Sequence, residues 1–95
     1  MALDELVLSG EDALKVADAL TSTSFRILQL LSTEALDVST IAERLELSEA
    51  YMSEQISLLE ELKLVKVNYE KGKKGIRKIC QSAVRKITIV IKSEA

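Results

Sequence analysis

The sequence predicts a small α+β domain in which helices are followed by a β-hairpin and a C-terminal strand. Two patterns predict this order: apolar residues recur at helical spacing through the first two-thirds of the chain, and they alternate at strand spacing afterwards. The chain has 95 residues, of which 47% are hydrophobic and only three are aromatic: Phe25, Tyr51 and Tyr69. We therefore expect a single domain over residues 1–95 with a core of Leu, Ile and Val, unless a partner supplies part of that core.

The composition excludes several classes of protein. No run of about 18 apolar residues is present, so no membrane span is expected. The acidic start MALDELVLSG lacks the basic beginning of a secretion signal, and the single cysteine, Cys80, fits a reducing cytoplasm. The sequence has no histidine, no glycine-rich phosphate loop and no nucleophile–base set, so we expect no enzyme, no cofactor and no metal.

The net charge of −2 conceals a sharp division along the chain. Residues 1–62 hold three basic and thirteen acidic side chains, a net of −10. Residues 63–95 hold ten basic and two acidic side chains, a net of +8. A polyanion is therefore expected to meet the C-terminal third and to be repelled by much of the rest.

Two helices are expected in the first third. The spacing Ser9-x-x-Asp12 predicts a capping box at the start of the first helix, which carries an apolar stripe on one face. The cluster Thr21–Ser24 ends that helix and offers caps for the next one, Phe25–Leu31. This second helix is apolar on most sides and is expected to be central.

A helix-turn-helix pair follows. Asp37 is a good N-cap for a short helix that ends at Leu45, and Glu46-Leu47 then forms a tight turn. Ser48 is predicted to cap a longer helix that runs to about Leu62. Its buried side is predicted to carry Met52, Ile56 and Leu59. Its exposed side is predicted to carry Ala50, Ser53, Glu54 and Ser57.

Alternating apolar residues predict three strands after this pair. Leu64–Tyr69 and Ile76–Cys80 are expected to form a hairpin whose tip is Lys71–Gly75. Five basic residues surround the tip, and phosphate contact explains them better than a merely solvated face: Lys71, Lys73, Lys74, Arg77 and Lys78. The isoleucine-rich segment Lys86–Lys92 is a further strand, which pairs either within the fold or across a dimer. Residues 6–8 form either a short strand or a frayed end.

The order helix, turn, helix, strand and basic loop is that of a winged helix-turn-helix. The segments FRILQLL (25–31), STIAERL (39–45) and LLEELKLV (58–65) resemble the ArsR-like winged-helix transcriptional regulators, in a version seen in archaea. The resemblance covers about residues 20–78 and includes Leu47-Ser48 and Met52-Ser53. It implies a homodimer in which the helix Ser48–Leu62 reads DNA, the hairpin is the wing, and the terminal segments make the dimer contact.

Three departures from the family pattern affect this resemblance. Glu54 stands where the family often has a basic residue or glutamine; its carboxylate repels phosphate but can accept a hydrogen bond from a cytosine amino group. Glu46 stands where glycine is usual, so a left-handed residue there costs roughly 1 kcal/mol. The segment Asp37–Leu45 has no cysteine, which excludes a thiolate metal sensor at that site.

The sequence thus predicts sequence-specific binding of double-stranded DNA by a homodimeric transcriptional regulator, a repressor. The recognition-helix residues expected at the interface are Ser48, Glu49, Ala50, Tyr51, Ser53, Glu54, Gln55 and Ser57. The five basic residues of the hairpin are expected on the phosphate backbone. A protein-interaction module and a non-specific chromatin protein remain alternatives. Cys80 is either a packed strand residue or a redox-sensitive thiol, and no ligand pocket is expected.

Overall fold

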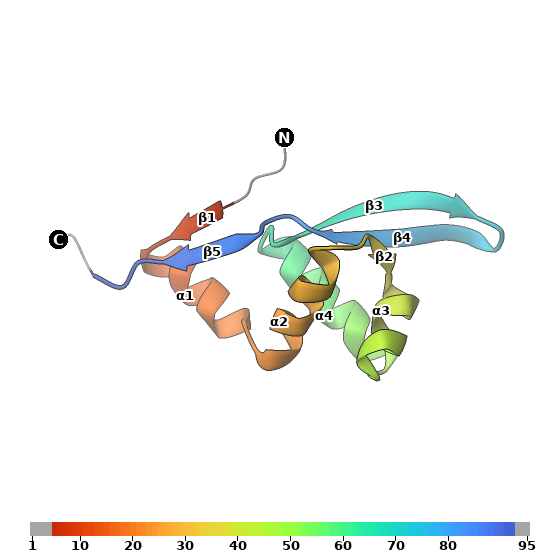
Figure 1. Ribbon diagram of the computed structural model, residues 1–95, viewed down its shortest axis with the longest axis horizontal. Helices are drawn as coiled ribbons and strands as arrows, with labels where there is room; N and C mark the ends of the chain where they lie inside the picture. Colours follow the sequence, from red (N-terminus) through yellow and green to blue (C-terminus); the bar gives the residue numbers. More distant parts are fainter. Residues whose placement is uncertain (1–4, 93–95) are drawn as a thin grey trace.

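The computed structural model describes residues 5–92, and its order of elements confirms the predicted α+β winged helix-turn-helix (Figure 1). The elements are β1 (Glu5–Leu8), α1 (Gly10–Ala19), α2 (Ser22–Leu31), β2 (Leu36–Asp37), α3 (Val38–Leu45), α4 (Glu49–Glu61), β3 (Val65–Gly72), β4 (Gly75–Ser82) and β5 (Lys86–Ile89). The predicted elements are all present, and the two-residue strand β2 is an addition that no sequence pattern indicated.

Two small sheets organise the strands. Strands β2, β4 and β3 form an antiparallel sheet in which Asp37 lies opposite Ile79. Strands β1 and β5 form a separate parallel pair, so the C-terminal strand pairs within the fold and residues 6–8 are not frayed. Strand β5 ends at Ile89, opposite Leu8, where its partner also ends. The predicted strand was therefore too long, and Ile91 lies beyond it, 94% exposed.

The hydrophobic core lies between the helices and the three-stranded sheet. Helices α2, α3 and α4 each bury one face in this core, and Cys80 on the inner face of β4 packs against them. The predicted inner face of α4 is confirmed, because Met52, Ile56 and Leu59 are all fully buried. Helix α2 is less completely buried than its sequence suggested, because its apolar residue Phe25 is 56% exposed.

Side-chain caps begin three of the four helices. Asp37 caps α3 and Ser48 caps α4, as predicted. Thr21, from the cluster expected to supply a cap, forms a capping box with Ser24, and α2 therefore begins at Ser22 and not at the predicted Phe25. The capping box predicted at Ser9 is wrong: the Ser9 side chain makes no cap hydrogen bond. The chain enters α1 from strand β1 through Gly10 at φ +59°, and this left-handed first residue departs from the helical geometry that a capping box needs.

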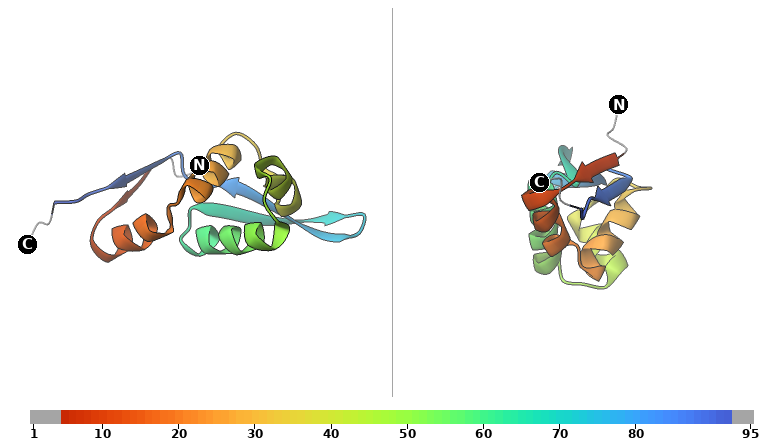
Figure 2. Two further views of the ribbon diagram at one scale, coloured as in Figure 1. Left: turned by 90° about the horizontal axis from the view of Figure 1, so that it is seen from below. Right: turned by 90° about the vertical axis from the view of Figure 1, so that its left-hand side faces the viewer.

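The molecule is elongated, with principal extents of 54 × 29 × 19 Å. The wing, formed by β3 and β4, projects at one end (Figures 1 and 2). Helix α1 and the β1–β5 pair lie at the other end, and helices α2 to α4 lie between them. Over the described residues 5–92, none of the helices has the length and apolar character that a membrane crossing requires.

Candidate nucleic-acid interface

The turn between α3 and α4 is closed by backbone hydrogen bonds. Glu46 adopts φ 57° and ψ 45°, the left-handed conformation that the family resemblance implied at this position. The N–H of Leu47 donates to the carbonyl of Ala42 at 2.9 Å, and the N–H of Glu46 donates to that of Glu43 at 3.2 Å. This pair of bonds satisfies carbonyls at the end of α3 and fixes the direction in which α4 starts.

Helix α4 presents its predicted outer face to solvent. Ser48 caps it, with the hydroxyl accepting a hydrogen bond from the N–H of Tyr51 at 3.1 Å. Tyr51 is 39% exposed, and Gln55 is half-buried at the edge of the outer face. The remaining predicted contact residues of this helix are exposed: Glu49, Ala50, Ser53, Glu54 and Ser57.

The outer face of α4 is shallow and acidic. Small side chains at Ala50, Ser53 and Ser57 leave a groove of about 550 Å³, bordered at the C-terminal end of the helix by Leu58 and Glu61. The helix sequence EAYMSEQISLLEE contains no Lys or Arg. The outer face therefore offers hydrogen-bond acceptors and hydroxyls, but no cation for a phosphate.

The wing ends in a tight turn of two lysines. Gly72 and Gly75 lie opposite each other, so that Lys73 and Lys74 form the loop between the strands. Gly75 has φ +119°, which side chains rarely tolerate. Three exposed lysines occupy this end of the wing, and none has an ion-pair partner among residues 5–92. We call them the tip lysines: Lys71, Lys73 and Lys74.

Arg77, which lies opposite Glu70 in the hairpin, is held by a carboxylate instead. Its Nη2 and Nε donate to Oδ2 of Asp37 at 2.8 and 3.2 Å. The other carboxylate oxygen of Asp37 accepts the N–H of Thr40 at 2.9 Å. Hydrogen bonds from Thr40, followed by those from Arg77, lower the pKa of Asp37 to about 2. One carboxylate thus caps α3 and fastens strand β4 to that helix.

Lys78 also faces a carboxylate. Its Nζ lies 4.0 Å from Oε1 of Glu60, near the end of α4. The five basic residues predicted as one phosphate-binding group therefore fall into two sets. The tip lysines project freely, whereas Arg77 and Lys78 connect the wing to α3 and α4. Neither Asp37 nor Glu60 carries a sequence signal for this role, because both pairs join distant parts of the chain.

Cys80 is fully buried on β4, where it belongs to the hydrophobic core. Burial raises the pKa of its thiol to about 11, and the nearby Lys78 offsets only part of this effect. The thiol is therefore protonated at neutral pH, as expected of a packed strand residue. Within residues 5–92, no group of His, Cys, Asp or Glu is arranged to hold a metal ion.

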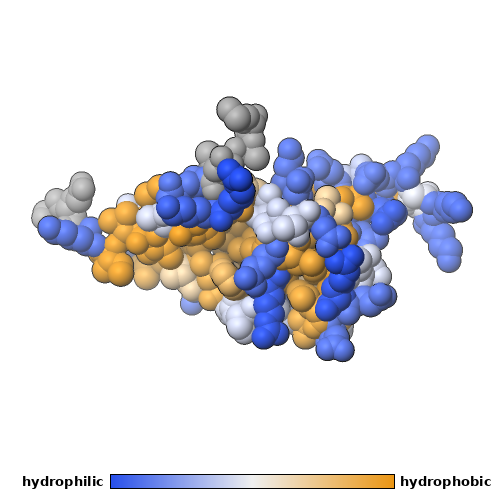
Figure 3. All heavy atoms as spheres, viewed as in Figure 1, coloured by the Kyte–Doolittle hydropathy of each residue, from blue (hydrophilic) through white to orange (hydrophobic). Residues whose placement is uncertain are grey.

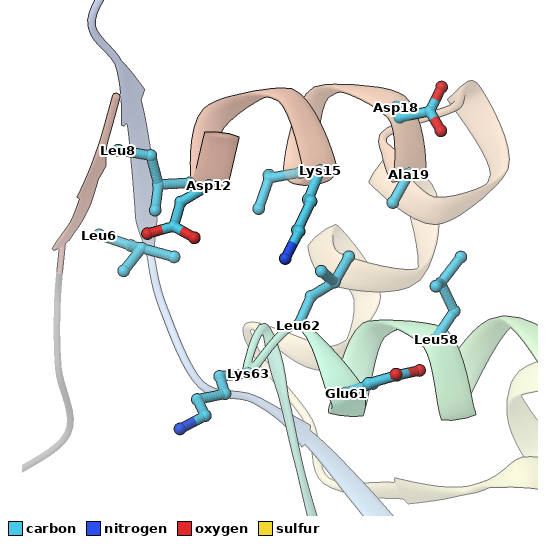
Figure 4. Close-up of a pocket in the computed structure, with 11 residues that line it drawn as sticks. Leu6, Leu8, Asp12, Lys15, Asp18, Ala19, Leu58, Glu61, Leu62 and Lys63 are labelled. Carbon is cyan, nitrogen blue, oxygen red and sulfur yellow. The ribbon is translucent and has the colours of Figure 1, made fainter. Parts of the chain in front are cut away.

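A half-open hollow of about 690 Å³ lies between β1, α1 and the end of α4. Figure 4 shows Asp12 and Lys15 extending from α1 toward the space bordered by Leu6 and Leu62. Its lining comes from two distant segments, residues 6–19 and 58–63, which no local pattern of the sequence connects.

Apolar side chains gather at the end of the molecule away from the wing (Figure 3). Leu14 on α1 is 64% exposed, and Val90 and Ile91 follow β5. These three residues border a groove of about 470 Å³ between α1 and the end of β5. We call this surface the α1–β5 face.

The fold and this arrangement define a winged helix-turn-helix protein. The chain belongs to the helix-turn-helix domain family, whose model matches residues 19–68. No match was found among curated proteins.

Several solved structures share the fold. Reduced HlyU from Vibrio cholerae is 22% identical, with a TM-score of 0.64 over 76% of this chain and 73% of that one. A possible transcriptional regulator from Methanosarcina mazei is 17% identical, with a TM-score of 0.62 over 76% and 63%. An ArsR-like transcriptional regulator from Rhodococcus is 25% identical, with a TM-score of 0.56 over 75% and 64%. The chain thus spans less than two-thirds of the length of the last two proteins.

Proposed function

We propose that the chain is an ArsR-like transcriptional regulator that binds a specific sequence of double-stranded DNA as a homodimer and acts as a repressor. The proposal rests on two features that occur together. Helix α4 has an exposed outer face, and the tip lysines of the projecting wing have no carboxylate partner among residues 5–92. The first element suits a major groove, and the second suits a phosphate backbone. Similarity to solved structures described as transcriptional regulators supports the same conclusion.

In this proposal the outer face of α4 specifies sequence. Ala50, Ser53, Glu54 and Ser57 face base edges, and Ser48, Glu49, Tyr51 and Gln55 lie beside them. The tip lysines position the protein on the backbone. Arg77 and Lys78 are already paired with carboxylates, so their phosphate contacts are secondary. Three backbone contacts correspond to a log–log salt slope of about −3 per subunit.

The proposed dimer forms through the α1–β5 face. When a second copy covers exposed aliphatic side chains such as Leu14 and Ile91, apolar surface is removed from water, and this burial stabilises the dimer. Because this face lies at the end opposite the wing, dimerisation leaves both wings uncovered. A two-fold axis then predicts a near-palindromic operator with half-sites about one helical turn, or 34–36 Å, apart.

The acidic outer face of α4 favours one competing function. Glu49, Glu54 and Glu61 lie on an exposed helix that has no cation, which suits a protein partner better than a polyanion. In that case the tip lysines dock an acidic surface of another protein. This alternative predicts weak DNA binding without sequence preference.

Selection of bound duplexes from a random DNA library distinguishes these functions. We expect a near-palindromic motif to be enriched by the wild type and by Lys66→Ala, which removes an exposed lysine far from the wing tip. The double variant Lys73→Ala/Lys74→Ala should retain little DNA at all. Binding without enrichment would indicate a non-specific chromatin protein, and no binding at low salt would indicate a protein-interaction module.

A further inference from the structure

We propose that Glu54 determines the operator sequence by selecting a cytosine in each half-site, an inference that rests on the proposed DNA-binding function. Glu54 lies in the middle of the outer face of α4 and is exposed. Its neighbours in the shallow groove are the small residues Ala50, Ser53 and Ser57. Leu58 and Glu61 line the groove only toward the C-terminal end of the helix, so the part next to Ala50 and Ser53 is lined by small side chains.

Within the part of the chain that the structure describes, the carboxylate of Glu54 has no partner. No hydrogen bond or ion pair joins it to another of the described residues 5–92. The residues three and four positions away on the helix are Ala50, Tyr51, Ser57 and Leu58, and none of them is basic. The charge is therefore available to act on DNA.

An ionised carboxylate only accepts hydrogen bonds. In the major groove, the donors are the amino groups of cytosine and adenine, whereas guanine and the thymine carbonyl present acceptors. Adenine places its N7 acceptor beside its amino group, so a second carboxylate oxygen meets a lone pair there. Cytosine presents its amino group between the O6 acceptor of the paired guanine and its own C5–H, so a carboxylate that approaches from the C5 side meets a donor and no second acceptor. The chemistry of Glu54 thus favours cytosine over the other three bases.

The same charge acts against all other sequences. Without an amino group to pair with, Glu54 brings an uncompensated negative charge close to phosphates, and α4 has no cation to offset it. The residue therefore lowers affinity for non-operator DNA while it contributes a hydrogen bond at the operator. This combination explains why an acidic side chain is compatible with the reading face of a DNA-binding helix.

Glu54→Gln and Glu54→Ala test the proposal, with Glu61→Gln as the matched control on the same helix. Binding is measured on duplexes that carry each of the four bases at every half-site position. At one position, we expect the wild type to prefer cytosine by on the order of tenfold. The glutamine variant should shift that preference toward adenine, which its amide can contact twice, and the alanine variant should lose it. Both variants should bind scrambled DNA more tightly than the wild type does.

Glu61→Gln should raise the affinity for all duplexes without changing the preferred base. A cytosine preference that survives in both Glu54 variants would overturn the proposal while leaving DNA binding by α4 intact. Lack of any sequence preference in the wild type would instead overturn the proposed function itself. Because Glu54 is exposed and unpaired, unchanged circular dichroism spectra and melting temperatures are expected for both variants.

Discussion

Arg77 on the wing and Asp37 at the start of α3 form one of the ion pairs that join the wing to the helix-turn-helix. The guanidinium donates twice to one carboxylate oxygen, at 2.8 and 3.2 Å, although the two residues are forty positions apart. The same carboxylate caps α3 through Thr40. The angle between the wing and the helix-turn-helix is therefore fixed by a group that also begins the first of its two helices.

Removing the charge of Asp37 should cost stability in a pH-dependent way. Asn keeps a capping oxygen for the N–H of Thr40 but loses the attraction to Arg77. The pKa of Asp37 lies near 2 in the fold and at about 3.8 when unperturbed, so its contribution is present above pH 4 and is lost as the pH falls toward 2. We expect Asp37→Asn to destabilise the protein by about 1–2 kcal/mol at pH 7, after allowance for solvent screening.

Urea unfolding between pH 2 and pH 7 measures this effect, and the two proteins should converge at the acidic end. Glu34→Gln is the control, because it breaks the exposed ion pair with Arg44 and should change stability little. A stability difference that stays constant down to pH 2 would show that Asp37 acts without its charge.

The tip lysines should supply affinity without sequence preference. Lys73→Ala is expected to weaken binding to operator and scrambled duplexes alike and to reduce the salt slope by about 1 per subunit. Ser53→Ala, on the outer face of α4, should instead change which sequence is preferred. Fluorescence anisotropy at several salt concentrations separates the two effects. Equal losses on all duplexes for both variants would contradict this division of roles.

Replacing either of two residues with left-handed backbone conformation by glycine should stabilise the fold. Glu46 and Lys63 have φ of 57° and 65°, each at the end of a helix. A side chain in this conformation costs roughly 1 kcal/mol, so Glu46→Gly and Lys63→Gly should each raise stability by up to about that amount. Glu43→Gly, inside α3, should lower it by about 0.5–1 kcal/mol. Thermal unfolding followed by circular dichroism measures all three, and destabilisation by both terminal glycines would contradict the expectation.

A charge on the α1–β5 face should separate the proposed dimer. Leu14→Glu is expected to elute as a folded monomer with reduced affinity for a palindromic operator, because the two half-sites are no longer bound together. Ile76→Glu is the matched control: Ile76 is 75% exposed, but it lies on the wing. Light scattering after gel filtration should show a dimer for this control and for the wild type. An unchanged dimer in Leu14→Glu would place the interface elsewhere.

Features that arise from neighbouring residues could be predicted from the sequence. Asp37 and Ser48 precede helical patterns, and caps of this kind act within a single turn. The burial of Met52, Ile56 and Leu59 follows from helical spacing alone. The left-handed conformation of Glu46 followed from the family resemblance, because glycine is usual at that position in the family.

Features that join distant segments could not be predicted. The parallel pairing of β1 with β5 aligns Glu5 with Lys86, and neither strand encodes its partner. The division of the basic residues depends on which of them approach Asp37 and Glu60. Lys63 shows a further limit: it is left-handed because the chain turns sharply from α4 into β3, although its residue type favours no such conformation.

The most direct test of the proposed function is a titration of the purified protein against duplex DNA from its own upstream region and against a scrambled duplex. Fluorescence anisotropy should be recorded at several salt concentrations. We expect tight, sequence-dependent binding of the upstream duplex with a steep salt dependence, and weaker binding of the scrambled one. Equal weak binding of both duplexes, or no binding at low salt, would contradict sequence-specific regulation by α4 and the wing.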